Sequence, residues 1–449
     1  MSFLVSPGVQ VKEIDLTNVV PAVDTTIGAI AGPFEKGPVS SVTLVGSEAE
    51  LLKNFGKPNA SNFEFWFTAS NFLKYSNALK VVRPESAIVN AGESSGVLVR
   101  DTDHYITDFY ATTGDGQSTT NDWIARDAGT LGNSIGVELC PSPEAYEQDL
   151  GVKNLVNGAG AVGDTTITVD DADESGFAFQ VGDMIKFHTN NSVTATSNGA
   201  ITTASINLTV DGNSGTIAVG QRVIASGINE VVKVKTVTSQ TALILDKPIT
   251  IANDIDMAFS PYASVEAGDT QYEVTAINSE VLSIRLKDDP DSGGLQTIIP
   301  DNSFITRRWR FADLFDAAPR QSEYNRVNGR GTGDEVHIAV FDTTGLISGA
   351  DVNVAGQRKN SVLETFSNLS LNPAAKGPQG DSIYYPTVLY NQSEYIYWGD
   401  HIAAGTNWGT DTTSAYTEIR PITTVSLTGG TDDYAVTAGE LELAYDKFA

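Results

Sequence analysis

The chain has 449 residues, of which 41% are hydrophobic, so it exceeds the size of one ordinary domain and can bury several cores. Its net charge of −28 argues against a nucleic-acid binder, because phosphate contacts need a surplus of lysine and arginine. The single cysteine, Cys140, excludes an intrachain disulfide, and no apolar run reaches the roughly 18–20 residues of a membrane-spanning helix. The N-terminus lacks the basic and apolar segments of a signal peptide, so we expect folding in a reducing cytoplasm without membrane insertion.

The first predicted element is an isolated strand near the N-terminus. Apolar and polar residues alternate from residue 9, slip phase once at Glu13, and then resume. Pro7-Gly8 breaks the chain before this strand, and no turn sequence follows that would fold a hairpin back onto it. The pattern therefore predicts a strand arm over residues 1–22 that needs a pairing partner. The apolar positions of the arm are Val9, Val11, Ile14 and Leu16.

Residues 23–153 alternate between strand and helix patterns, which is typical of an α/β layer arrangement. A short apolar strand within residues 25–38 precedes a helix that Ser47 and Glu50 begin as a capping box and Gly56 ends. A helix with a broad apolar face and a short strand follow, and a Gly-rich loop later leads into another strand. We predict that this stretch is the first part of an α/β core.

The stretch from about 154 to 290 changes character, because threonine, valine, isoleucine and glycine dominate it. It contains an internal echo, in which residues 166–187 resemble residues 207–226. Each copy is a strand ending in Val-Asp, a loop, a Val-Gly pair and a second strand. Closely spaced strands with turns between them indicate a small barrel or sandwich. We therefore predict an inserted all-β barrel or sandwich domain over residues 154–297.

The last stretch, residues 298–449, returns to a mixed pattern and is predicted to be the second part of the α/β core. Residues 334–342 form a nearly continuous apolar strand, and apolar residues at helical spacing predict a helix beginning at Asn360 or Ser361. The aromatic-rich residues 384–400 are strand-like. A final helix is expected to begin at Thr437, and because the chain stops in its first turns we expect an incomplete core at the C-terminus.

The residues that usually carry catalysis or bind metals do not form a recognisable pattern. None of His104, His188, His337 and His401 stands at metal-ligand spacing from another ligand, and no phosphate-binding or nucleophile motif is present. The acidic clusters at residues 170–175 and 288–294 do not follow a calcium-loop pattern and are better interpreted as solvated turns. We therefore predict no enzymatic activity and no cofactor or metal.

A run of arginines between residues 306 and 330 is the one basic island in this acidic chain. Its surroundings are too acidic for a nucleic-acid patch, so we predict salt bridges between subunits or between domains. An uninvolved surface stretch is the alternative. The residues predicted to form this patch are Arg307, Arg308, Arg310 and Arg320.

Several short motifs occur in an order that is similar to a known family. Ser6-Pro7-Gly8, Gly37-Pro38 and the run from Phe55 to Pro58 appear in sequence, and two islands follow at residues 123–140 and 425–448. In this order they resemble the contractile tail sheath proteins of T4-like bacteriophages. The resemblance covers roughly the first 85 residues and the two islands, whereas the β-rich stretch has no counterpart.

The resemblance implies a structural function and an α+β multidomain fold with a sheath core. A sheath subunit polymerises around the tail tube and contracts from a metastable extended lattice to drive the tube through the host envelope, without nucleotide. Its partners are identical subunits, the tail tube protein, and baseplate and tail terminator proteins. Its expected location is the tail sheath of the virion, after assembly in the cytoplasm of the host bacterium.

The resemblance also assigns a partner to the arm. Sheath arms add a strand to a sheet of an adjacent subunit, so Val9, Val11, Ile14 and Leu16 are expected to contact a neighbour. Pairing within the arm's own subunit remains the alternative. Family members continue past the equivalent of Ala449, so either this chain is a fragment or another chain completes the core.

Two other functions stay open. A virion surface or adhesin-like protein would bind glycan through the β-rich stretch, and an exposed row of aromatic residues there would favour it. The aromatic residues available are Phe177, Phe179, Phe187, Phe259 and Tyr262. A glycan hydrolase is a weaker third option, since it needs a carboxylate pair in a cleft.

Overall fold

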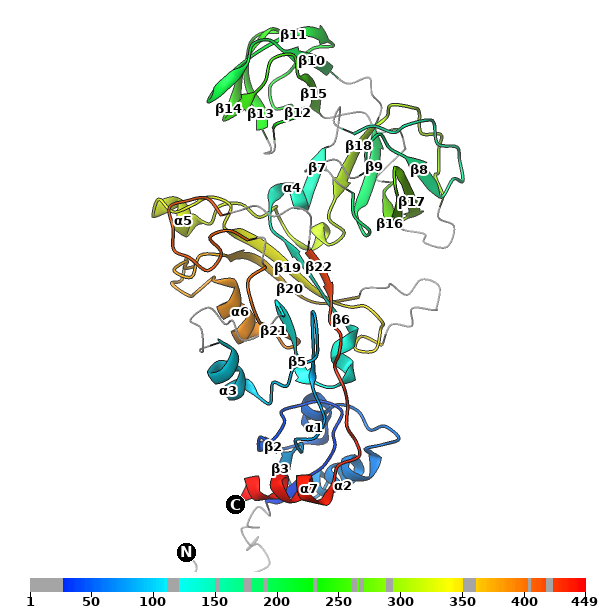
Figure 1. The fold of residues 1–449 in the computed structure, drawn as a ribbon, viewed down its shortest axis with the longest axis vertical. Helices are drawn as coiled ribbons and strands as arrows, with labels where there is room; N and C mark the ends of the chain where they lie inside the picture. Colours follow the sequence, from blue (N-terminus) through cyan, green and yellow to red (C-terminus); the bar gives the residue numbers. More distant parts are fainter. Residues whose placement is uncertain are drawn as a thin grey trace, which may run out of the picture.

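The protein is an α+β chain whose modules follow one another along its longest axis (Figure 1). A terminal module lies at the end that holds the C-terminus, two central sheets follow, and two β modules occupy the opposite end. The computed structural model describes residues 27–110, 121–149, 154–172, 179–188, 193–228, 232–260, 265, 270–287, 294–349, 361–402, 405–416 and 423–449.

The terminal module (residues 27–83 and 438–449) is a three-stranded sheet with helices on both faces. Its strand order is β1-β3-β2, and α1 and α2 cover one face while α7 packs on the other. Alternation along β1 sends Ile30 toward α1 and α2 and Ala31 toward α7. The elements are β1 (Gly28–Ala31), β2 (Thr43–Val45), α1 (Glu48–Phe55), α2 (Phe63–Leu73), β3 (Leu79–Val82) and α7 (Ala438–Tyr445).

Two helix starts predicted from the sequence are confirmed. The Ser47 side chain accepts a hydrogen bond from the backbone N–H of Glu50 at the start of α1. Thr437 begins α7 with a full capping box, in which the Glu440 carboxylate also accepts from the Thr437 backbone N–H.

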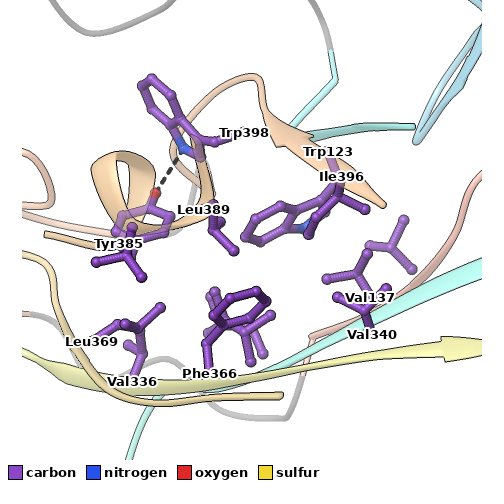
Figure 2. Close-up of a cluster of buried hydrophobic side chains, with 14 of the residues drawn as sticks. Trp123, Val137, Val336, Val340, Phe366, Leu369, Tyr385, Leu389, Ile396 and Trp398 are labelled. Carbon is purple, nitrogen blue, oxygen red and sulfur yellow. Dashed lines mark hydrogen bonds between the residues drawn. The ribbon is translucent and has the colours of Figure 1, made fainter. Parts of the chain in front are cut away.

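The central part consists of two antiparallel sheets that share one hydrophobic core. Their strand orders are β20-β19-β6-β22 and β21-β5-β4, and α6 packs beside them. Figure 2 shows this core, in which Trp123, Phe366 and Leu389 meet and the Trp398 indole N–H donates to the Tyr385 hydroxyl over 2.9 Å. The elements are β4 (Asn90–Gly92), β5 (Trp123–Ala128), β6 (Ile135–Cys140), β19 (Glu335–Asp342), β20 (Ser361–Ser370), α6 (Tyr385–Gln392), β21 (Ile396–Trp398) and β22 (Thr423–Ser426).

The helix predicted from Asn360 or Ser361 is wrong, because residues 361–370 form strand β20. Val336 of β19 faces Leu369 and Ile338 faces Phe366, so two residues on β19 oppose three on β20. Asn368, with a φ of 51°, lies at this bulge. The extra residue puts Phe366 and Leu369 on the same face at a spacing of three, which imitates a helical pattern.

The strand predicted for the aromatic stretch 384–400 is correct only at its end. The structure forms α6 first, with Pro386 in its first turn, and only then the short strand β21. Proline is favoured at the start of a helix because it needs no intrahelical hydrogen-bond donor there. The guanidinium of Arg126 donates to the carbonyls of Tyr390 and Ser393 and so satisfies the C-terminal end of α6.

The β-rich stretch contains two modules with separate hydrophobic cores. The inner β module (residues 147–188 and 270–308) has the strand order β7-β18-β9-β16-β17-β8, and the outer barrel (residues 193–260) is the closed barrel β10-β11-β14-β13-β12-β15. The strands are β7 (Glu147–Asp149), β8 (Thr166–Thr168), β9 (Met184–His188), β10 (Val193–Ser197), β11 (Ile201–Ser214), β12 (Arg222–Ala225), β13 (Val232–Ser239), β14 (Ala242–Ile251), β15 (Asp256–Ser260), β16 (Tyr272–Asn278), β17 (Val281–Leu286) and β18 (Phe304–Arg308).

The two modules have the same topology. When the strands of each are numbered in chain order, the inner β module follows the neighbour order 1-6-3-4-5-2, and the outer barrel follows the same order. The pairing that closes the outer barrel joins its first two strands, β10 and β11, and an isolated bridge between Val156 and Val169 joins the corresponding segments of the inner β module. The outer barrel is thus a second copy of the module into which it is inserted.

The duplication extends to single hydrogen bonds at the turn that the sequence echo predicted. In the inner β module the Gly182 N–H donates to the Val274 carbonyl over 2.7 Å, and in the outer barrel the Gly220 N–H donates to the Val234 carbonyl over 2.8 Å. Both glycines have a φ near 90°, which only glycine adopts readily. The echoed Val-Gly pairs therefore mark equivalent positions of two copies.

Short helices complete the fold. They are α3 (Thr102–His104), η1 (Tyr105–Tyr110), η2 (Thr130–Ser134), α4 (Pro143–Tyr146), η4 (Ala312–Leu314), α5 (Glu323–Val327) and η5 (Asp446–Phe448).

Because the outer barrel has its own core, it should unfold as a separate unit. Leu245 is fully buried in that core, so Leu245→Ala should lower the unfolding free energy of the outer barrel by about 2–5 kcal/mol. All five tryptophans lie outside residues 193–260, so tryptophan fluorescence does not report on this barrel. We expect a lower first transition by far-UV circular dichroism and an unchanged fluorescence transition.

The matched control is Val219→Ala in the same barrel, where the side chain is 65% exposed and its loss should change neither transition. A fluorescence transition that moves together with the circular dichroism signal in Leu245→Ala would show that the outer barrel does not unfold independently.

Candidate assembly site

Exposed apolar side chains gather on the terminal module. Nine of the eighteen large hydrophobic residues that are exposed in the described part of the chain belong to it, although it is a small fraction of the molecule. Such a concentration on a soluble surface marks an interaction site. The nine are Ile27, Val42, Leu44, Leu52, Phe63, Phe67, Tyr75, Leu443 and Tyr445.

The sheet of the terminal module has open edges. Among the described strands, β1 and β2 each pair only with β3, so one side of each backbone is unpaired. Unpaired strand edges are templates for adding a further strand. The sheet end of the molecule is therefore open, whereas the outer barrel at the other end is closed and has no edge.

Small residues let α2 lie directly on β1. A Cβ atom on Gly28 would stand 2.5 Å from the Phe72 ring, and one on Gly32 would stand 2.5 Å from the Phe65 ring. These distances are shorter than real Cβ contacts, so a side chain at either position would force the ring to shift. The rings thereby close one side of a groove.

This groove runs along the edge strand β1 and has a volume of about 450 Å³. Residues of β1 and α2 line it, together with Leu79 of β3 and Tyr445 of α7. Its lining is mainly apolar, with Glu64 and Thr68 as polar members. We call it the β1 groove; it is lined by Gly28, Ala29, Ile30, Glu64, Phe65, Thr68, Ala69, Phe72, Leu79 and Tyr445.

A buried arginine fixes the terminal module to the central sheets. Arg83 follows β3, is 2% exposed, and donates to the carbonyls of Gly37, Ala128 and Glu35 over 3.3, 2.7 and 3.2 Å. Burial lowers its pKa to about 10, although the nearby carboxylate of Asp127 opposes the shift. The guanidinium stays charged at neutral pH, and its bond to the Ala128 carbonyl links the terminal module to the central sheets.

The predicted arginine patch divides in the structure. Arg307 is 3% exposed and lies 3.5 Å from Asp183, and its guanidinium also donates to the Glu144 carbonyl over 3.3 Å. Arg308 lies 3.8 Å from Glu147 and also contacts Asp313. The pairs with Asp183 and Glu147 are internal to the inner β module, at its end next to the central sheets. Whether this patch also contacts other subunits stays a prediction.

The other two predicted arginines differ in position. Arg310 pairs with Glu138 of β6, and the same carboxylate accepts from the Trp309 indole N–H over 2.6 Å. Arg320 is exposed, and its backbone N–H donates to the Glu335 carboxylate over 3.0 Å. Three of the four predicted arginines therefore meet at the junction, whereas Arg320 lies at the start of β19.

The arm residues Val9, Val11, Ile14 and Leu16 lie outside the described residues, so their assignment stays a prediction. Arg83 and the exposed aromatic residues of α2 were missed by sequence reasoning. The position of Arg83 directly after a strand and before Pro84 is the only signal in the sequence that marks it.

The histidines and the cysteine take part in ordinary structural contacts, such as that between His104 and Asp108 over 2.9 Å. His337 is buried, with one ring nitrogen 2.7 Å from the Ala317 carbonyl, and burial lowers its pKa. Burial also lowers the pKa of His188 to about 4 and raises the pKa of the Cys140 thiol. Within the described ranges, no group of three or more potential ligands is arranged to hold a metal ion.

No helix in the described part of the chain has both the length and the apolar character needed to cross a membrane.

Comparison with known proteins gives three significant matches, although no family model matches the chain. It is 45% identical over 80 residues to the tail sheath protein of Vibrio phage KVP40, and 30% identical over 135 residues to that of Enterobacteria phage T4. It is 32% identical over 142 residues to the tail sheath protein of Salmonella phage ViI. Over these stretches the chain is similar to phage tail sheath proteins.

The matches cover only part of each sequence. They include 18%, 30% and 31% of this chain, and 12%, 20% and 22% of the respective sheath proteins. The aligned part of this chain thus spans less than a quarter of the length of each relative.

The junction between the modules should depend on its buried carboxylate. Glu138→Gln would leave the positive charge of Arg310 buried without a counter-charge, which typically costs about 3–5 kcal/mol of unfolding free energy. Urea denaturation followed by tryptophan fluorescence would measure this loss, since Trp309 bonds the same carboxylate.

Glu323→Gln is the matched control. Glu323 pairs with Arg326 on the surface, where both side chains are more than 60% exposed, and exposed pairs contribute little to stability. Equal losses in the two variants would contradict the structural role of the Glu138 junction.

Proposed function

We propose that the protein is a structural, non-catalytic subunit of a contractile phage tail sheath. The similarity to tail sheath proteins supports this function. The observation in this structure that supports it most is the asymmetry of the molecule. Half of the exposed large hydrophobic residues of the described part and two open strand edges lie at the terminal module, whereas the opposite end is a closed barrel. Subunits of this shape assemble through one end and project the other outward.

The arm over residues 1–22 is the proposed link between subunits. It precedes β1 in the sequence, so it is connected to the module that has the open edges. Strand addition uses main-chain hydrogen bonds, and alternate side chains such as Val9 and Val11 then give the contact its register. A linked strand stays engaged while the bodies of two subunits rotate past each other.

Contraction on this proposal is a change between two packings of the same subunits. The extended lattice is metastable, and its release lets the subunits move to a wider lattice of lower free energy. The proposed partners are identical subunits, the tail tube, and baseplate and tail terminator proteins. The protein is assembled in the bacterial host and resides in the tail sheath of the virion.

The proposed domain division keeps the arm at residues 1–22, the two parts of the sheath core at 23–153 and 298–449, and the β-rich insertion at 154–297. Within that insertion the duplicated topology supports a further division into the inner β module and the outer barrel.

The structure argues against the glycan-binding alternative. Phe179, Phe187 and Phe259 are 5%, 0% and 0% exposed, so they belong to the cores of the two β modules and offer no stacking surface to a sugar. The remaining candidates, Phe177 and Tyr262, lie outside the described residues.

Deleting residues 1–17 should abolish polymerisation while leaving the folded body intact. Without these residues of the arm, the open strand edges of a neighbouring subunit have no added strand with which to pair. Negative-stain electron microscopy shows whether tubes or rings form, and circular dichroism shows whether the fold is kept. Tubes of unchanged length and yield from the shortened protein would reject the arm as the link.

Removing the outer barrel should have the opposite result. Phe187 and Tyr272 of the inner β module occupy the positions of Ala225 and Val232 in the outer barrel, where residues 226–231 join the two strands. Replacing residues 188–271 with the sequence of residues 226–231 should therefore reconnect the inner β module and leave polymerisation unchanged. Loss of tubes in a folded protein of this kind would place an essential contact on the outer barrel.

A further inference from the structure

The terminal module carries an aromatic stripe on the surface of α2. Phe63 and Phe67 stand one turn apart on this helix and are 48% and 50% exposed. Exposed phenylalanines at this spacing form a continuous apolar ridge. We call these two residues the α2 stripe.

The opposite flank of the same helix borders the β1 groove. Phe65, Thr68 and Phe72 line the groove, and at about 100° per residue they lie on average roughly 150° around the helix from the α2 stripe. One helix therefore presents an apolar ridge on one side and an apolar hollow on the other.

We propose that the α2 stripe of one subunit docks in the β1 groove of the next, so that the occupant of the groove is a second copy of this chain. This inference rests on the proposed function. The α2 stripe and the β1 groove lie on opposite flanks of α2. A second copy that is shifted sideways in nearly the same orientation therefore places its α2 stripe against the β1 groove of the first copy. Each subunit then contacts one neighbour through its α2 stripe and another neighbour through its β1 groove.

A contact of this kind is heterologous, and its geometry fits a helical assembly. Repeated head-to-tail contacts form rings when the rotation closes and open helical filaments when it does not. A symmetric dimer would instead require the same surface on both partners. Opposite charges on the two flanks are consistent with the docking, since Lys74 continues the line of the α2 stripe and Glu64 borders the β1 groove.

The size of the contact sets its strength. Two aromatic side chains bury about 150–250 Å² each, well below the roughly 1,000 Å² that a lasting interface needs. The stripe alone would not hold two subunits together in dilute solution. It adds to the assembly only when arm pairing already places neighbours side by side, which predicts monomers at low concentration.

Cysteine cross-linking tests the contact directly. Phe67→Cys and Thr68→Cys are made as separate proteins, one with an affinity tag, and are mixed, polymerised and mildly oxidised. Both positions are exposed, and the native Cys140 is fully buried, so background cross-linking is low. We expect several-fold more disulfide-linked dimers in the mixture than in either protein alone, resolved on a non-reducing gel.

A double variant provides the second measurement. Phe63→Ser combined with Phe67→Ser should reduce the yield of polymer several-fold, whereas Tyr75→Ser, at a side chain that is 93% exposed and off the stripe, should not. Circular dichroism and gel filtration establish that the variants are folded.

The outcomes separate this inference from the proposed function. Tubes that form without mixed cross-links overturn the stripe-in-groove contact and leave the sheath function standing. Equally strong cross-linking of Phe67→Cys with itself also overturns it, because that result indicates a symmetric contact. If the arm of a neighbour fills the groove instead, cross-links from Thr68→Cys to a cysteine at Val9 replace those to residue 67. Absence of polymers in every preparation, including the unaltered protein, rejects the proposed function itself.

Discussion

The antiparallel pairing of β6 with β19 is the contact on which the rest of the arrangement depends. Six consecutive residue pairs join these strands, from His337 with Cys140 to Asp342 with Ile135, although residues 141–334 lie between them in the chain. Just beyond this pair, β7 and β18 also pair, so the chain leaves and re-enters the central sheets at adjacent points. An insertion with adjacent ends costs little loop entropy and leaves the parent sheet undisturbed.

The outer barrel is inserted into the inner β module in the same way. The outer barrel is inserted between β9 and β16, which pair with each other in the inner β module. The molecule therefore extends by nesting, and each of the two β modules enters at the end of an antiparallel pair of the preceding module (Figure 1). Successive insertions of this kind place each β module farther along the longest axis of the molecule.

The junctions of this column are buried and polar. At one joint Arg83 donates to the Ala128 carbonyl of the central sheets, and at the other Arg310 pairs with Glu138 of β6. A buried charge requires a partner at a fixed position, so these contacts specify one orientation of each module. The apolar surface that remains exposed is then concentrated on the terminal module.

Local features of the fold could be predicted from the sequence. Ser47 and Thr437 cap helices because the capping residue and its partner are three residues apart, and the Val-Gly echo marked equivalent turns of two related modules. These signals depend only on neighbouring residues.

Features that depend on distant residues could not be predicted. The spacing of Phe366 and Leu369 imitates a helix because a bulge at Asn368, set by pairing with β19, adds one residue to the strand. The partner of Arg310, Glu138, stands 172 residues away, and nothing in the local sequence identifies it. The candidate site is likewise visible only once α2, β1 and α7 are assembled.

The joints between modules are strong, whereas the proposed contacts between subunits are weak. This contrast bears on how the subunits could change from one packing to another. A lattice that changes its packing without falling apart needs rigid bodies, so that the change falls on the surfaces between them. Arginine joints such as those at Arg83 and Arg310 resist bending because breaking either would deprive a largely buried charge of a hydrogen-bond partner. A contact of two phenylalanines can open and re-form at small cost, while a paired arm keeps the subunits linked. The distribution of buried charge and exposed aromatic surface in this chain therefore favours movement between subunits over movement within one.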